Sequence, residues 1–308
     1  MAADTNASLA TDLGLAAVFA NMEFAELLHE SRDLKAVCRN VPFVAGAGSA
    51  TMKIRQIQVK DTMTAPGEDT APAITNFTTG NATLTVARST LLRSVSDLAL
   101  ISGEMDAKVV AKSFAASLIY RRSLMISALS AGLTANTAVG TSTVGLTVDT
   151  VYAAIFALRK AFVSGSLDFV GHEANVCQFL ASLRGETATP LQIAAETQGA
   201  LASDHSGDVE FTWMNTRFRS HASVPTANGG LDYSCMLVGE GCLGYTEAPV
   251  ASILRQYAFN PVAMNGESAI IVSDLSTETK GSRSWVCHAY MGVGELEDAR
   301  GIQIIAAV

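Results

Sequence analysis

Two cysteines lie close to histidines along the chain, and a Cys/His pair can supply a thiolate nucleophile or metal ligands. Cys177 follows His172 by five residues, and Cys287 directly precedes His288. Neither pair has the doubled spacing of a zinc site, and a lone cysteine is more often a small buried apolar side chain. The five cysteines are odd in number and lack a CxxC spacing, which indicates reduced thiols.

Two other patterns imitate nucleotide or hydrolase chemistry. Residues 239–244 match GxGxxG after a strand-like run, but a dinucleotide site needs a helix to open there, and Glu240 would repel a phosphate. A glycine-rich turn between strands is the better interpretation. Asp204, His205 and Ser206 are adjacent, whereas a catalytic triad is assembled from distant segments. We therefore expect no enzyme activity, no cofactor and no metal, with a Cys/His hydrolase as the enzymatic alternative.

Composition indicates a protein that works in an assembly. Of 308 residues, 49% are hydrophobic and only 16% are charged, against about a quarter in a typical soluble domain. Such a chain is not disordered, and much of its surface is expected to be covered in the working state. The net charge of −8 argues against a protein that grips nucleic acid electrostatically. The longest uncharged stretch is rich in Ser, Thr and Gly, so no membrane span is expected.

The elements that would position these residues begin with an acidic arm and a hairpin. Residues 1–31 contain five acidic residues and no Lys or Arg. Alternation of apolar and polar residues predicts strands over 52–59 and 82–88, with a bulge or twist near Gln56. The polar connection of about 20 residues is long for a compact domain, so the two strands are expected to form a projecting hairpin.

Helical patterns follow. Capping signals predict a long helix from Ser102 to Gly132, about 45 Å in length. A second helix is expected to begin at Thr147, with an apolar face made by Tyr152, Ile155, Phe156 and Phe162. Further along, we expect a strand over 167–170, a helix over 173–183, an alternating segment over 209–218, and strands over 233–238, 269–272, 285–290 and 301–306.

The order of these parts resembles the major capsid proteins of tailed bacteriophages, which share the Hong Kong 97-type fold. The stretches that carry the likeness are Arg93-Ser-Val-Ser-Asp97-Leu, Leu146-Thr-Val-Asp-Thr-Val151, Asp168-Phe-Val-Gly-His-Glu173, Tyr290-Met-Gly-Val293 and Gly301-Ile-Gln-Ile-Ile305. The sequence departs from the family pattern after His172, where no proline follows, and across the irregular residues 187–230.

The resemblance implies an α+β fold with four parts. These are an N-terminal arm (1–44), an extended β-hairpin loop (45–95), a peripheral domain with the spine helix (96–146 and 247–308), and an α/β axial domain (147–246). It also implies assembly contacts at the hairpin tip and its flanking strand. The residues expected there are Lys53, Arg55, Lys60, Thr64, Ala65, Pro66, Gly67, Glu68 and Asp69.

The function that the resemblance implies is that of a major capsid protein. Copies would form hexamers and pentamers of an icosahedral shell around the double-stranded DNA of a tailed phage, assembled in the host cytoplasm. Expected partners are other copies, a portal, a separate scaffolding protein, a decoration protein, and DNA contacted weakly on the inner face. Open alternatives are an encapsulin-like shell and another virion protein such as a tail-tube subunit, which would lack the spine helix.

Overall fold

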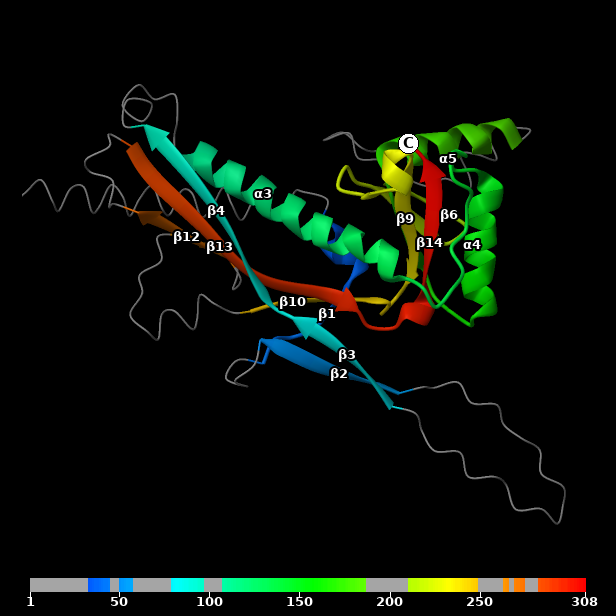
Figure 1. The fold of residues 1–308 in the computed structure, drawn as a ribbon, viewed down its shortest axis with the longest axis horizontal. Coiled ribbons are helices and arrows are strands. Elements are labelled where there is room, and N and C mark those ends of the chain that lie inside the picture. Colours follow the sequence, from blue (N-terminus) through cyan, green and yellow to red (C-terminus); the bar gives the residue numbers. More distant parts are fainter. Residues whose placement is uncertain are drawn as a thin grey trace, which may run out of the picture.

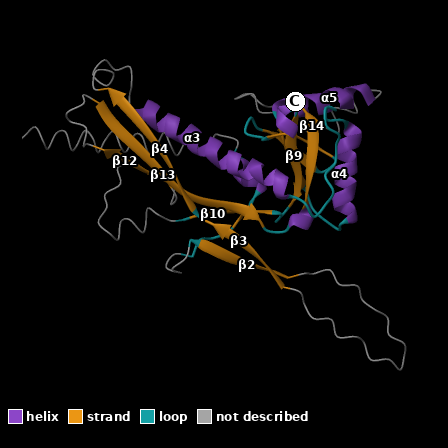
Figure 2. Ribbon diagram, viewed as in Figure 1, coloured by secondary structure: helices purple, strands orange, loops and turns teal. Residues whose placement is uncertain are grey.

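The computed structural model describes residues 33–44, 50–57, 79–96, 107–186, 210–248, 263–265, 269–274 and 282–308. Within these ranges the chain forms two six-stranded sheets, a separate two-stranded hairpin, three α-helices and short 3-10 turns. One sheet and the helix α3 make an elongated part, and the other sheet makes a compact part with α4 and α5 (Figure 1). The hairpin projects from the elongated part, well away from the helices (Figure 2).

The elongated sheet is organised around one long strand, β13 (Ser282–Glu295). Its other strands are β1 (Arg39–Asn40), β4 (Ala87–Ser96), β10 (Leu243–Glu247), β11 (Ala263–Asn265) and β12 (Ala269–Asp274). The first part of β13 lies between β4 and β12, and its end pairs with β10, all antiparallel. A single strand therefore runs the length of the sheet and joins its two halves.

The compact sheet has the order β14-β9-β5-β7-β6, with β8 also paired to β9. Its strands are β5 (Leu167–Gly171), β6 (Glu210–Trp213), β7 (Thr216–Ser220), β8 (Thr226–Ala227), β9 (Asp232–Gly239) and β14 (Gly301–Ala307). Every residue of β5 is buried, as expected for a strand covered on both faces. Against β5 packs an aromatic cluster in which the ring of Phe218 lies 4.9 Å from Phe169, 4.7 Å from Phe179 and 4.5 Å from Phe211, between ring centroids.

The hairpin consists of β2 (Thr51–Ile57) and β3 (Thr79–Thr85). Both strands were expected from the alternating pattern, but the second was predicted over 82–88, and residues 87 and 88 belong to β4. Their antiparallel register is continuous from Thr51 opposite Thr85 to Ile57 opposite Thr79. The bulge predicted near Gln56 is therefore wrong, because Gln56 pairs in register with Gly80.

The long helix α3 (Ala107–Ser127) continues into a 3-10 turn that ends at Gly132, as the sequence predicted. The predicted start at Ser102 lies outside the described residues. The described part of the helix buries Phe114, Leu118 and Ile126 on one side. Val109, an apolar residue near the start of the described helix, is 47% exposed.

The helix α4 (Val148–Lys160) begins as predicted, because the Thr147 side chain accepts a hydrogen bond from the Thr150 amide. Its predicted apolar face is confirmed at Ile155 and wrong at the three aromatic residues. The residues that face the core are Val151, Ala154, Ile155 and Leu158, whereas Tyr152, Phe156 and Phe162 are exposed. The side of α4 that packs on the sheet carries aliphatic residues, and its aromatic rings lie on the outer side.

The remaining elements of the compact part largely agree with those predicted from the sequence. The helix α5 (Glu173–Glu186) runs three residues past the end predicted at Leu183. The alternating segment predicted over 209–218 is a tight hairpin, β6 and β7, because Met214 and Asn215 both adopt left-handed backbone conformations between them. Strand β14, which the predicted domain division placed in the peripheral domain, is hydrogen-bonded to β9 in the compact sheet. The domain boundaries themselves remain a prediction.

Candidate assembly surfaces

The root of the β2–β3 hairpin is held against the body by a close approach between two backbones. Leu84 of β3 is fully buried beside Leu296, which follows the end of β13. A Cβ atom added to Gly292 would lie 2.5 Å from the carbonyl oxygen of Thr85, and one added to Gly294 would lie 2.7 Å from Leu84. The backbone of β3 therefore leaves no room for a side chain at Gly292, whereas at Gly294 the Leu84 side chain would have to move.

The residues predicted to make assembly contacts are only partly described. Lys53 lies on β2 and is exposed. Arg55 lies two positions further along the same strand. The predicted tip contacts, Lys60, Thr64, Ala65, Pro66, Gly67, Glu68 and Asp69, lie outside the described residues. Their role therefore stays a prediction.

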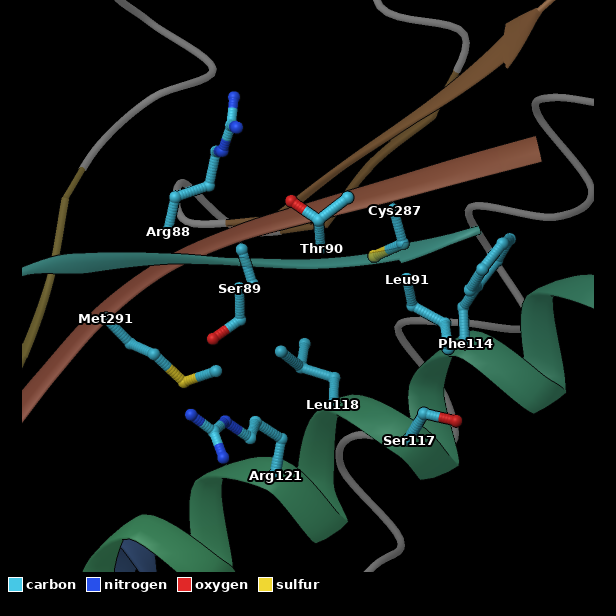
Figure 3. A pocket seen from close by; sticks show the side chains of 11 residues that line it. Arg88, Ser89, Thr90, Leu91, Phe114, Ser117, Leu118, Arg121, Cys287 and Met291 are labelled. Atoms are coloured by element: carbon cyan, nitrogen blue, oxygen red, sulfur yellow. The ribbon is translucent and has the colours of Figure 1, made fainter. Parts of the chain in front are cut away.

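A pocket of 340 Å³ lies between α3 and the strands β4 and β13. Leu91 and Ser89 point from β4 toward the helix, and Phe114 and Leu118 face them, while Arg121 reaches toward the same space (Figure 3). The walls are mainly apolar, and Arg88, Arg121 and several hydroxyl groups also line them. Such a pocket can accept an apolar side chain that carries a hydrogen-bond acceptor.

Cys287 and its sequence neighbour His288 do not form a catalytic pair. Cys287 lines the pocket, and burial raises the pKa of its thiol to about 11, so the sulfur is protonated at neutral pH. His288 follows it in β13, where side chains alternate between the two faces, and its Nδ1 lies 3.1 Å from the Thr90 hydroxyl. The pocket therefore lacks an activated nucleophile.

The other candidate catalytic groups are likewise unsupported where they are described. His172 accepts a hydrogen bond from the Ala174 amide through Nδ1, and its ring stacks on Tyr233 at 4.0 Å. Cys177 lies on the exposed side of α5, and the structure shows no hydrogen bond between its thiol and His172. The GxGxxG segment is a turn from β9 into β10 with Gly241 at φ +80°, as predicted, and strand β10 follows it directly where a dinucleotide site would need a helix. Residues 204–206 lie outside the described residues.

Burial also keeps most of the remaining thiols protonated. It raises the pKa of Cys38 and of Cys235 to about 12 and raises the pKa of Cys242 further. All five cysteines are free. No group of His, Cys, Asp and Glu in the described ranges is arranged to hold a metal ion. None of the described helices is long and apolar enough to span a membrane.

A buried ionic cluster joins the N-terminal segment to α3 and β10. The Arg122 guanidinium, with a side chain 7% exposed, forms ion pairs with Asp33 and with Glu247, the latter at 3.0 Å. The Tyr245 hydroxyl donates a hydrogen bond to Glu247, and the Lys35 ammonium lies 3.3 Å from the same carboxylate. Three segments far apart in the sequence therefore meet at one arginine.

The charges of this cluster stabilise one another. Burial disfavours the charged form of Glu247, but the hydrogen bond from Tyr245 and the charges of Lys35 and Arg122 outweigh it and lower its pKa. Burial likewise opposes the charge of Arg122, and its neighbours outweigh this and raise its pKa. Burial raises the pKa of Tyr245, so its hydroxyl remains a donor. Sequence reasoning missed this cluster, although a base within the apolar stripe of the long helix, four residues after Leu118, signals a buried partner.

No protein family model matches the chain, and no curated protein matches it. Solved structures match nearly all of it. The capsid of cyanophage P-SCSP1u is 10% identical, with a TM-score of 0.56, over 88% of this chain and 86% of that chain. A structure of Mycobacterium phage Che8 is 11% identical, with a TM-score of 0.57, over 91% and 90%. The SrpI encapsulin of Synechococcus elongatus is 14% identical, with a TM-score of 0.58, over 89% and 86%.

Proposed function

Because the chain has the Hong Kong 97-type capsid fold, we propose that it is the major capsid protein of a tailed bacteriophage. Copies would assemble into the hexamers and pentamers of an icosahedral shell around double-stranded DNA. The observation that carries this proposal is the projecting hairpin, whose root is fixed to the body by the close approach at Gly292 and Gly294. The hairpin is anchored at its root, and its described strands project from the body. It is therefore suited to reach an adjacent subunit.

The contacts between subunits follow from this arrangement. The hairpin tip, Thr64 to Asp69, with Lys53, Arg55 and Lys60 beside it, would lie on an adjacent copy. The pocket between α3 and β4 would receive a side chain from a neighbouring copy, with Arg121 pairing its acceptor. Low charge over the whole chain supports this, since large permanent interfaces carry few charged residues.

The proposed partners beyond other copies are a portal, a separate scaffolding protein and a decoration protein. The net charge of −8 supports a container into which DNA is driven, with only weak contacts on the inner face. Assembly in the host cytoplasm belongs to the same proposal, as does the absence of enzyme activity.

A second candidate is an encapsulin-like shell, which the match to the SrpI encapsulin favours. Both candidates predict closed shells in negative-stain electron microscopy of the purified full-length protein. A monodisperse 32 kDa monomer at high concentration would contradict both. Particles isolated from the source cells separate them, because a phage capsid would contain double-stranded DNA and an encapsulin would contain a cargo enzyme.

A further inference from the structure

One end of the compact sheet presents two large apolar side chains, which we call the apolar knob. Phe162, in the turn between α4 and β5, is 80% exposed, and Met214, in the turn between β6 and β7, is 51% exposed. Both have left-handed backbones, at φ +60° and φ +48°, a conformation that bulky residues rarely adopt. Strained backbone of this kind persists where its surroundings fix it, and it is concentrated at functional sites.

Hydrogen bonds fix the two turns of the knob to each other. The Asn215 side-chain amide donates to the Gly165 carbonyl at 3.3 Å, and the Leu167 amide donates to the Asn215 carbonyl at 3.1 Å. The Arg159 guanidinium donates to the carbonyls of Val163 and Gly165 and closes the first turn. The apolar knob is therefore held in place before any partner binds.

The opposite end of the same sheet presents a second exposed apolar surface, which we call the C-terminal patch. Its residues Val144, Leu231 and Val308 are 48%, 60% and 55% exposed, and backbone hydrogen bonds join their three segments. The buried Asp232 side chain accepts hydrogen bonds from the two loops beside it. Strand β9 begins at this patch and ends opposite Leu167, next to the apolar knob, so the two surfaces lie at opposite ends of the sheet.

The charges of α4 at these two ends are complementary. The helix runs from the C-terminal patch to the apolar knob, with Asp149 in its first turn and Lys160 in its last turn, both exposed. Glu173, in the first turn of α5, adds an exposed acid at the end of the patch. At the end of the knob, the exposed Glu240 and Arg39 line one cleft, where their charges offset each other.

We propose that the apolar knob of one copy binds the C-terminal patch of the next copy, with Lys160 of the first beside Asp149 of the second. The contact joins two different surfaces, so it is head-to-tail and can close into a ring. This inference rests on the proposed function and identifies a contact within its rings of five and six copies. The knob lies at the end of the compact part nearer the hairpin, and the patch lies at the end marked by the C-terminus (Figure 1). One adjacent copy would therefore meet both the hairpin and the knob.

Paired cysteines test the contact in the full-length chain. In a Cys177→Ser background, which removes the exposed native thiol, Phe162→Cys and Leu231→Cys are made separately and together. Under oxidation by copper phenanthroline, we expect no cross-link from either variant alone and a cross-linked dimer from their co-assembled mixture. The chain with both changes should give a ladder that ends at five or six copies. A two-fold contact would instead cross-link one single variant with itself and would overturn the proposal.

The matched control replaces Phe156, an equally large aromatic residue on the outer face of α4 that is 64% exposed. Phe156→Cys combined with Leu231→Cys should give no ladder, because position 156 lies outside the knob. A ladder as strong as that of the Phe162 pair would show unspecific collision and overturn the assigned contact.

Removing the knob tests what the contact contributes to assembly. Phe162→Ser with Met214→Ser should leave urea unfolding of the chain unchanged, because both side chains are exposed, and should lower particle yield about tenfold. Shells in normal yield from this variant, with no ladder from the paired cysteines, would overturn the contact and leave the capsid function standing. A ladder without closed shells in electron microscopy would keep the contact and contradict the capsid function.

Discussion

The compact sheet and the projecting hairpin are built from strands of similar length but are stabilised differently. In the compact sheet, β5 is buried throughout, and aromatic rings from β5, β6, β7 and α5 pack on one another. In the hairpin, the buried residues of β3 are Ala82 and Leu84, near its root. The comparison teaches that alternating apolar and polar residues are enough to form a strand. Whether that strand is stable within its own chain depends on how much of it other elements bury.

The largest effect should come from breaking the compact core. Phe218→Ala removes the ring at the centre of the aromatic cluster and should destabilise the unassembled chain by about 3–5 kcal/mol. Urea unfolding followed by tryptophan fluorescence measures this. Phe156→Ala makes the same truncation on an exposed face and should cost less than about 0.5 kcal/mol. Equal costs would contradict the description of this core.

The next effect should come from the hairpin root. Gly292→Ala places a methyl group against the Thr85 carbonyl, so β3 must shift, at a cost of about 1–3 kcal/mol. Particle yield should fall sharply, because the tip would leave the body at another angle. Lys53→Ala, on the exposed face of the same hairpin, should leave the unfolding free energy unchanged. Normal shells from the glycine variant would show that the exit angle is unimportant.

The ionic cluster should give a pH-dependent effect. Glu247→Gln keeps Arg122 paired with Asp33 and should cost about 1.5 kcal/mol at neutral pH. Because the pKa of Glu247 is lowered by folding, its stabilising effect is present above the unfolded value of about 4.3 and is lost as pH falls through the folded value. The two proteins should therefore converge in acid. Glu240→Gln, at an exposed acid in the β9–β10 turn, should match the wild type at every pH.

The smallest effect on folding should come from the hairpin tip. Replacing Thr64–Asp69 by a short Gly-Ser turn should change monomer unfolding by less than about 1 kcal/mol. Shells should nevertheless be lost or become fragile, since the proposed contacts of the tip form between copies. Thermal unfolding and particle yield, measured together, test both halves. Normal shells of undiminished stability would remove the basis for the assembly role of the hairpin.

Most elements were predictable because their signals are local. The Thr147 cap, the alternating strands of the hairpin and the glycine-rich turn after β9 each depend on a few neighbouring residues. The order of the elements was enough to indicate the fold class, which the solved structures confirm. The tip contacts of the hairpin stay a prediction, since they lie outside the described residues.

Features that depend on distant segments were not predictable. The apolar pattern of α4 counts Tyr152 and Phe156 as core, but only the packed sheet shows that its inner face takes Ala154 and Val151. Arg122 meets acids from residues 33 and 247, which no spacing rule connects. The turn between β6 and β7 contains Asn215, a residue that tolerates left-handed backbone, and this could have indicated a hairpin.

The junction of β3 and β4 determines how a pull on the hairpin reaches the body. Only Val86 separates the two strands, and they follow one another almost in line (Figure 1). Strand β4 is paired with β13 over its ten residues. Tension applied at the tip is therefore delivered along β4 as shear, so all of these backbone pairs resist together instead of peeling apart one by one. The hairpin behaves as a tether anchored lengthwise, which suits a joint that bears mechanical load.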